Sequence, residues 1–390
     1  MKYFILILLM LSTTPKSFKS DSEVIIGAAR TSVYLPLLKG KRVALFSNQS
    51  GIVGSQHTLD ILLSHNINVV IIFSPEHGFR GDASAGELVY NSIDKVTGIP
   101  IHSLYGSHSP QSVPKTTIDK FDVIVSDIQD VGLRFYTYYI TLIQLMNLCI
   151  NNNKQMIIFD RPNPNGFYID GPILDMKHKS GVGYLPIPVV HGLTLGELAK
   201  MCNGEGWLID KKECKLQVIT IENYTHQTKY NLPIPPSPGL PNMKSVYLYP
   251  STCLFEATKV SYGRGTDFPF QVYAHPQLKN YYTFNFTPKK TPICKDPIYE
   301  GEICYGRDLR ELDDDVIIKN GFDLTYVIDA FVKLKGDTNF FSGHFERLVG
   351  VDYIREKILE GKSASEIKEM WKEDVEKFRE KRKKYLLYDE

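Results

Sequence analysis

The sequence predicts an α/β protein: a Rossmann-like domain with a mostly parallel sheet, then a smaller mixed α/β domain, with the active-site cleft between them. Two observations predict the first domain. Short apolar runs alternate with helical or loop segments, and these runs end abruptly at polar residues. A third observation, the proline-rich stretch 229–242, predicts a boundary. We therefore expect domains over 21–231 and 232–390.

The first domain is predicted to alternate strands and helices. Its expected strands cover 42–48, 69–74, 99–104, 121–127, 155–160 and, as an edge strand, 214–221. Its expected helices cover 57–64, 135–150 and a segment that opens over 193–200. In the last of these, Thr194 and Glu197 have the spacing of a capping box. Since the run 69–73 does not alternate with polar residues, we expect a strand buried on both faces.

The second domain shows mixed patterns. A strand is expected over 281–286 and a helix over 324–335. The stretch 363–388 is predicted to be one charged amphipathic helix. Its expected apolar stripe consists of Ile367, Met370, Trp371, Val375, Phe378 and Tyr385.

The N-terminus predicts export. Lys2 precedes the apolar run 3–11, and a segment of small and polar residues follows, as in a secretory signal peptide. The run is too short to span a bilayer, so we expect no stable membrane insertion after cleavage of residues 1–20. We expect a periplasmic or secreted protein. The net charge of +1 gives no indication of nucleic-acid binding.

No cofactor or metal motif is present in the sequence. The first strand is not followed by G-x-G-x-x-G, and no P-loop, HExxH zinc motif or G-x-S-x-G elbow occurs. The six cysteines include no CxxC pair. Cys294 and Cys304 lie in one irregular stretch, where either a disulfide or free thiols are compatible with the sequence. We therefore expect no cofactor and no metal.

Polar side chains follow four of the expected strands at the point where each strand ends. These residues are Asn48, Glu76, Asp127 and Asp160. Because the carboxyl ends of parallel strands lie on one edge of a sheet, the four groups should converge on one crevice. Pro75 ends its strand cleanly, which places Glu76 and the next residue at that edge.

Further polar clusters surround these strand ends. They contain His77 and Arg80; Asp130, Arg134, Tyr136 and Tyr138; Arg161 and Asn163; His191; and, in the second domain, Glu256 and Arg264. Taken singly, each cluster also fits a structural ion pair, a core tyrosine or a turn. The combination of all these clusters in one chain is a more specific indication of function than any one cluster.

The clusters together resemble the NamZ-type exo-β-N-acetylmuramidases, from residue 42 to the end of the chain. The matching motifs are 47–51, 74–81, 127–132, 134–138, 160–164, 191–198 and 263–266. The resemblance implies release of N-acetylmuramic acid from the non-reducing ends of bacterial peptidoglycan fragments, with Glu76 as the favoured catalytic carboxylate. The chain departs from the family at Gly239, where Asn is usual, and in 256–259, where Glu-Ala-Thr-Lys replaces Glu-Gly-Thr-Asn.

Glycoside hydrolysis needs a carboxyl group that protonates the leaving oxygen and a second group on the opposite face of the sugar. A glutamate at a strand end, partly desolvated by the second domain, suits the first role, which we assign to Glu76. Asp127 or Asp130 is the expected second carboxylate. His77 would tune Glu76 or hold the substrate N-acetyl group. The expected catalytic residues are therefore Glu76, His77 and Asp127.

The expected substrate contacts follow from the chemistry of muramic acid. Its lactyl carboxylate suits a planar guanidinium, offered by Arg80, Arg134, Arg161 or Arg264. Tyr136 is expected, with Tyr138, to stack on the sugar or to fill the core. The other expected binding residues are Asn48, Asp130, Asp160, Asn163, His191 and Glu256.

Two other functions remain open at this point. One is a metal-dependent esterase or amidase with His77, Asp127, Asp130 and His191 as ligands, although their spacing matches no known metal motif. The other is an exported glycan-binding protein that uses the same cleft without turnover. The sequence leaves the oligomeric state open.

Overall fold

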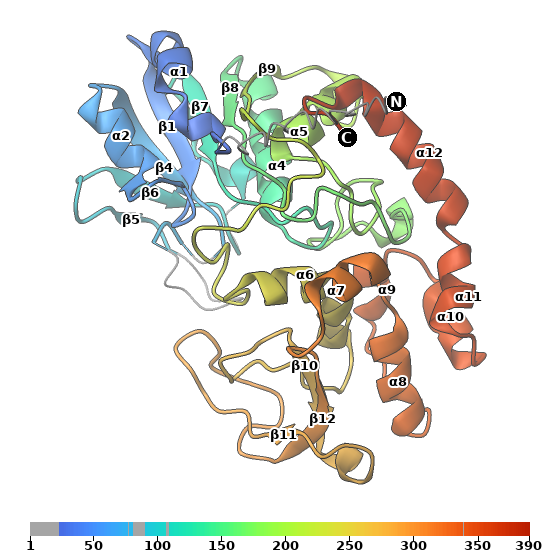
Figure 1. Ribbon diagram of the computed structural model, residues 1–390. Coiled ribbons are helices and arrows are strands. Elements are labelled where there is room, and N and C mark those ends of the chain that lie inside the picture. The colour runs from blue at the N-terminus through green and yellow to red at the C-terminus, as the bar shows by residue number, and fades with distance from the viewer. Residues whose placement is uncertain (1–22, 77, 81–89, 107–108, 338) are drawn as a thin grey trace, which may run out of the picture.

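The computed structural model describes residues 23–76, 78–80, 90–106, 109–337 and 339–390. It contains a seven-stranded sheet with the order β5-β6-β4-β1-β7-β8-β9 (Figure 1). The strands are β1 (Arg42–Ser47), β4 (Asn68–Ser74), β5 (Ser92–Ile93), β6 (Pro100–Ser103), β7 (Val123–Asp127), β8 (Gln155–Phe159) and β9 (Lys215–Ile219). The six predicted strands are confirmed, with β9 at an edge.

The strand order has the Rossmann pattern. From β1 the chain moves outward through β4 and β6, then returns to the other side of β1 and continues through β7, β8 and β9. All of these neighbours pair in parallel, and only the short β5 pairs antiparallel. Strand order therefore reverses between β1 and β7, the position at which open α/β sheets bind ligands.

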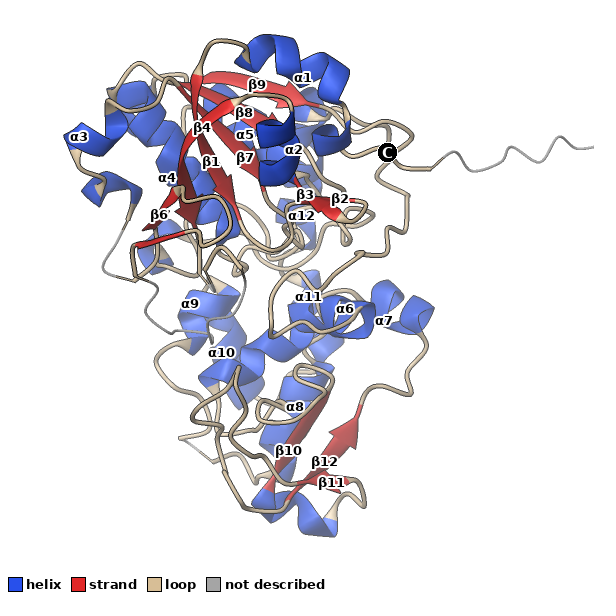
Figure 2. Cartoon of the chain, turned by 90° about the vertical axis from the view of Figure 1, so that its left-hand side faces the viewer, coloured by secondary structure: helices blue, strands red, loops and turns tan. Residues whose placement is uncertain are grey.

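Helices cover both faces of the sheet (Figure 2). Val43 and Leu45 of β1 belong to the apolar cluster that includes α1 (Thr31–Leu38) and α2 (Thr58–Ser64). Ala44 and Phe46 belong to the cluster of α4 (Tyr138–Asn151) and α5 (Leu195–Gly204). This alternation explains why the strand sequence is apolar throughout. The short α3 (Lys115–Ile118) and the hairpin of β2 (Ile52–Val53) and β3 (Gln56–His57) complete this part.

Two predicted helices of this domain occur with different starting points. The capping box of α5 is confirmed, since Thr194 accepts from the Glu197 N–H and the Glu197 carboxylate accepts from the Thr194 N–H. Helix α4 begins at Tyr138 rather than at 135. Residues 134–137 before it form a turn, in which the Tyr136 N–H donates to the Leu133 carbonyl at 3.0 Å, and Leu133 itself bridges to Val190.

The second part of the chain contains a three-stranded antiparallel sheet below the first domain in Figure 1. It comprises β10 (Val272–His275), β11 (Asn285–Phe286) and β12 (Cys304–Asp308), and the helices are α6 (Met243–Thr252), α7 (Asp314–Asn320), α8 (Thr325–Lys333), α9 (Phe345–Val349) and α10 (Tyr353–Leu359). Helix α8 confirms the prediction over 324–335. The predicted strand 281–286 is correct only for β11, because a 3₁₀ turn continues to Tyr281, whose N–H donates to Leu278.

The single C-terminal helix predicted over 363–388 is wrong. The segment forms α11 (Ala364–Glu369), α12 (Lys372–Arg382) and a 3₁₀ turn, Lys383–Tyr385. The break lies at Trp371, which is buried against Phe322 and donates its indole N–H to Asp170 at 2.9 Å. Met370, predicted to face the core, is exposed.

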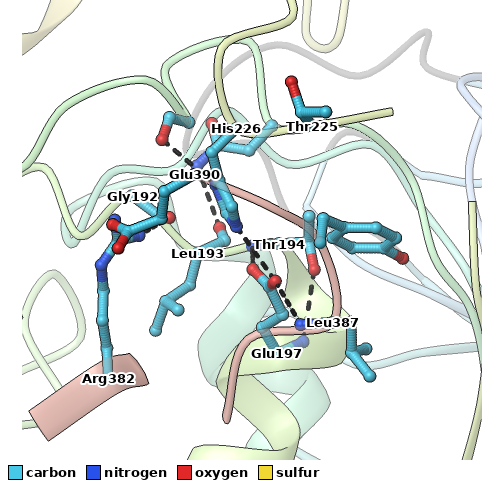
Figure 3. Close-up of polar contacts among 12 residues, drawn as sticks. Gly192, Leu193, Thr194, Glu197, Thr225, His226, Arg382, Leu387 and Glu390 are labelled. Atoms are coloured by element: carbon cyan, nitrogen blue, oxygen red, sulfur yellow. Dashed lines mark hydrogen bonds and ion pairs between the residues drawn. The ribbon is translucent and has the colours of Figure 1, made fainter. Parts of the chain in front are cut away.

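Helix α12 returns the chain to the first domain (Figure 1). Figure 3 shows Arg382 directed at the Gly192 carbonyl and the Glu390 carboxylate, to both of which it donates. The buried Glu197 carboxylate accepts from the Leu387 N–H at 2.8 Å and contacts His226 at 3.0 Å. The polar interior of the first domain thus includes residues from the end of the chain.

Within the described ranges, no helix is both long and apolar enough to cross a membrane. All six cysteines are free and buried, including Cys294 and Cys304. The expected signal peptide, 1–20, lies outside the described residues.

Tyr388→Phe should destabilise the first domain. The Tyr388 hydroxyl donates to Asp160 at 2.6 Å and accepts from the Ile221 N–H at 3.1 Å, both in the interior. Leaving these groups unpaired should lower the free energy of unfolding by about 1–3 kcal/mol. Urea unfolding would measure the change. The control Tyr281→Phe removes an exposed hydroxyl and should cost less than about 0.5 kcal/mol; equal losses would contradict the prediction.

Candidate active site

Five polar side chains lie at the carboxyl ends of neighbouring parallel strands. Asn48 follows β1, Glu76 follows β4, Tyr105 follows β6, Asp127 ends β7 and Asp160 follows β8. In Figure 2 the central strands run toward the second domain, so this edge faces the interdomain region. The structure places the four predicted strand-end groups on this edge.

Glu76 lies in the turn that follows β4 and is half-buried. Its carboxylate lies near the Tyr105 hydroxyl, and burial together with this carboxylate raises the pKa of Tyr105. Burial also raises the pKa of Tyr138, and the charge of Glu76 acts on it in the same direction. Glu76 is therefore held near aromatic hydroxyls at the edge of the sheet.

The second domain contributes Glu256 and Arg264 to the same region. Glu256 lies in the 3₁₀ helix η5 (Cys253–Ala257), and its carboxylate accepts from Nη2 of Arg264 at 3.0 Å. Burial raises the pKa of Glu256, Arg264 opposes this shift, and the charge of Glu76 adds to it. The charge of Arg264 in turn acts on Tyr105. We refer to Glu76, Tyr105, Glu256 and Arg264 as the interdomain cluster.

Sequence reasoning missed Tyr105, although the signal was present. The strand predicted over 99–104 also has a polar residue at its carboxyl end, by the rule that selected Asn48 and Glu76. The sequence alone does not single out Tyr105, because its hydroxyl follows an otherwise apolar run and belongs to no recognisable motif.

Glycines position the Arg264 loop. Gly263 and Gly265 have φ values of +84° and +82°, which residues with a Cβ rarely adopt. A Cβ at Gly265 would lie 2.7 Å from the Lys289 carbonyl oxygen. These two residues therefore allow the tight loop that presents the guanidinium between them.

Asp127 is bound within the protein. Its two oxygens accept from Nε and Nη2 of Arg161 at 2.6 and 2.9 Å, and Oδ2 also accepts from the Thr58 hydroxyl at 2.5 Å. Both members of the ion pair are almost fully buried. This pair fastens the end of β7 to the residues that follow β8.

Two more of the predicted arginines make internal contacts. Arg134 is fully buried, and its two terminal nitrogens donate to four backbone carbonyl oxygens at 2.6–3.0 Å. Arg80 forms an ion pair with the buried Asp94 at 2.8 Å and lies over the ring of Phe79.

The predicted binding residues that follow β8 also face the interior. Asp160 accepts from Thr194 and Tyr388, and burial raises its pKa to about 6. The Asn163 amide donates to the Leu193 carbonyl at 2.9 Å. Burial, together with the nearby Arg382, lowers the pKa of His191 to about 3, so its ring is neutral at physiological pH.

Asn48, Asp130, Tyr136 and Tyr138 line the edge between β1 and β7. Asn48 accepts from the Ser50 N–H at 2.9 Å. Asp130 accepts from the Gly132 N–H at 2.7 Å, while its buried Oδ2 has no partner in the described part of the chain. The two tyrosine rings pack edge to face at 4.8 Å. Both are buried, which fits a core role rather than an open stacking platform.

His77, predicted to act beside Glu76, lies outside the described residues. The predicted ligand set of a metal-dependent enzyme also includes it. In the ranges that the structure describes, no group of three His, Cys, Asp or Glu side chains is placed to hold a metal ion.

The comparisons with known proteins cover nearly the whole chain. The family model for the N-terminal part of exo-beta-N-acetylmuramidase NamZ matches residues 43–244, and the model for its C-terminal part matches 247–388. The chain belongs to the NamZ family. It is 36% identical over 382 residues to the peptidoglycan beta-N-acetylmuramidase NamZ of Bacillus subtilis, a match that covers 91% of this chain and 89% of the relative.

Two crystal structures of DUF1343 family proteins from Bacteroides fragilis have the same fold as this NamZ-family chain. One is 56% identical with a TM-score of 0.88 and covers 95% of this chain and 100% of its own. The other is 29% identical with a TM-score of 0.79 and covers 94% and 99%, respectively.

The departures from the NamZ pattern have different environments. Lys259 is on the surface, where its ammonium pairs with Asp337 at 2.8 Å. Gly239 lines a small hollow beside Arg264, Gly265 and Cys294, and a Cβ there would meet only Phe270, at 3.5 Å. The Lys259 charge is thus neutralised by a surface ion pair, whereas Gly239 leaves space next to the interdomain cluster.

Asp127→Asn should act mainly on stability. The substitution leaves the Arg161 guanidinium buried without its counter-ion, which should lower the free energy of unfolding by about 3–5 kcal/mol. Urea unfolding and activity should be measured on the same preparation. Lost activity should follow the lost folded fraction; a stable, folded variant with strongly reduced kcat would instead identify Asp127 as a catalytic residue.

Asp130→Asn should flatten the dependence of stability on pH. Burial raises the pKa of Asp130 to about 7 in the folded state. The unfolded carboxyl releases its proton near pH 4, so the folded state holds an extra proton between about pH 4 and 7, and wild-type stability falls as pH rises through that window. The neutral variant should avoid this loss of a few kcal/mol. The prediction would be contradicted if the urea midpoints of wild type and variant changed in the same way from pH 4 to 7.5.

Proposed function

We propose that this NamZ-family chain is an exo-acting glycosidase that removes N-acetylmuramic acid from the non-reducing ends of peptidoglycan fragments, with Glu76 as its catalytic acid. The interdomain cluster carries this proposal: it sets the Glu76 carboxylate, which lies near Tyr105, against a second carboxylate and a cation from the other domain. The matched relative named as a peptidoglycan beta-N-acetylmuramidase supports the substrate class.

In the proposed reaction, Glu76 transfers its proton to the glycosidic oxygen while the bond from that oxygen to the anomeric carbon breaks. Water then supplies the hydroxyl of the released sugar and returns the proton. The Tyr105 hydroxyl is near Glu76, where it can orient the carboxyl group. Both groups stand on turns that directly follow sheet strands, which hold a catalytic geometry better than long loops do.

We assign the second carboxylate role to Glu256 rather than to Asp127. Glu256 lies on the opposite domain, close enough to Glu76 for their charges to interact. The Asp127 oxygens are bound by Arg161 and Thr58. A carboxylate that is already part of a buried bidentate ion pair is poorly suited to act on the anomeric centre.

We also propose that the chain is exported to the periplasm or the medium. The support is the sequence of residues 1–20, with Lys2 before a short apolar run. Export would bring the enzyme to the compartment that holds the cell wall.

Glu76→Gln should abolish most of the turnover. The amide keeps the size of the side chain but cannot give a proton to the leaving oxygen, so kcat on a chromogenic β-N-acetylmuraminide should fall about 10²–10⁴-fold. Release of the chromophore measures the rate, with and without EDTA. Wild-type turnover should be indifferent to EDTA.

The matched control for this substitution is Glu213→Gln, which changes an exposed glutamate next to β9 and should leave kcat unchanged. A folded wild-type protein that binds muramic-acid glycans without turnover would point to a glycan-binding protein. Loss of wild-type activity in EDTA would point to a metal-dependent enzyme.

A further inference from the structure

An enzyme that acts on muramic acid must distinguish this sugar from N-acetylglucosamine. N-acetylmuramic acid differs from N-acetylglucosamine by a lactyl ether on the sugar ring, which adds a carboxylate. A guanidinium is the side chain best matched to a carboxylate, because its planar N–H groups form two parallel charge-assisted hydrogen bonds. An enzyme that selects the muramic residue therefore needs an arginine with uncommitted donors at the sugar site.

Two of the four predicted arginines are buried. Arg134 is bonded to four carbonyl oxygens. Arg161 is 3% exposed and bidentate on Asp127. A substrate carboxylate would have to displace these contacts. Arg80 is 44% exposed, but its Nε and Nη2 both bind one oxygen of the buried Asp94, and it lies outside the interdomain cluster.

Arg264 differs from the other three. Its side chain is 27% exposed, and one terminal nitrogen, Nη2, binds Glu256. Its other terminal nitrogen, Nη1, makes no hydrogen bond within the described part of the chain, whereas its unpartnered Nε is buried. The guanidinium lies 5.7 Å from the ring centroids of Tyr262 and of Phe270. It is thus held by aromatic contacts and one carboxylate, and Nη1 is the donor left for a ligand.

Arg264 also borders a small hollow. The hollow beside it is lined by Pro238, Gly239, Thr266 and Cys294. Because Gly239 has no side chain, nothing from residue 239 projects into this space. The charge of Arg264 acts on Tyr105, the residue whose hydroxyl lies near Glu76. A sugar at Glu76 would therefore have its ring substituents within the field of this cation.

We infer that Arg264 binds the lactyl carboxylate of the muramic residue and so makes the site selective for muramic acid over N-acetylglucosamine. This inference rests on the proposed function. Glu256, the second carboxylate of the proposed reaction, also binds Nη2 and so helps to position the guanidinium.

The test compares two chromogenic β-N-acetylmuraminides, one with a free lactyl carboxylate and one with the same group as a neutral amide. If Arg264 pairs with the carboxylate, wild type should prefer the acid about 10- to 100-fold in kcat/KM. Arg264→Gln should lose this preference, so that the ratio of kcat/KM for the acid to kcat/KM for the amide falls to about one; the rate on the amide falls as well, because Glu256 loses its partner. Turnover of the amide also reports that the variant is folded.

Two further variants make the test specific. Arg310→Gln is the matched control, because Arg310 also pairs with a carboxylate, Asp308, and lies over an aromatic ring, Phe268; it should keep the wild-type preference. Arg264→Lys keeps the positive charge but lacks the planar N–H donors of a guanidinium, so it should retain part of the wild-type preference. Equal losses on both substrates in Arg264→Gln, or an unchanged preference for the acid, would overturn the inference.

Failure of the proposed function would give a different result. In that case folded wild type hydrolyses neither substrate, and calorimetry with free N-acetylmuramic acid and N-acetylglucosamine replaces the kinetic measurement. Tighter binding of the muramic sugar that is lost in Arg264→Gln would still support the contact. Equal binding of the two sugars by wild type would overturn it.

Discussion

The buried guanidinium of Arg134 joins the two domains on which the candidate site depends. Arg134 donates to the carbonyl oxygens of Pro172 and Ile187 in the first domain and of Leu348 and Val349 at the end of α9 in the second. Burial lowers its pKa to about 10, which still leaves it charged at neutral pH. A buried cation without a carboxylate depends on hydrogen bonds to its donors. The four carbonyls supply these bonds to its two terminal nitrogens only while the domains are packed together.

The packing around Arg134 extends to the interdomain cluster through a few direct contacts. Helix α9 packs on η5, the element that carries Glu256. Just before α9, the Ser342 N–H donates to the carbonyl of Ala257 at 2.9 Å. One apolar cluster also continues from α4 and α5 into α6, α8 and α9. Glu256 is therefore fixed relative to Glu76 by packing rather than by a flexible hinge. A hydrolase that places its groups on two domains needs this rigidity to keep them within reach of one substrate.

Sequence reasoning predicted the sheet because strand ends are marked locally, by runs such as 69–74 followed by Pro75. It could not assign the arginines, since a guanidinium beside a carboxylate in sequence pairs with whatever the fold brings near. Arg161 meets Asp127 from a neighbouring strand end, and Arg134 meets carbonyls more than 200 residues away. The break at Trp371 could not be predicted either. The helical spacing of apolar residues continues across Trp371, and the helix ends there because tertiary packing buries this side chain.

The return of the chain end to the first domain has a consequence for the order of folding. Asp160 obtains a hydrogen bond from Tyr388, 228 residues later, and Glu197 obtains one from Leu387, 190 residues later. During synthesis the parallel sheet therefore emerges long before the partners of its buried carboxylates exist. Until α12 docks, these carboxylates lack the hydrogen bonds that compensate for their burial. The Rossmann-like part can complete its interior only after translation of residue 388, so its final packing step belongs to the whole chain.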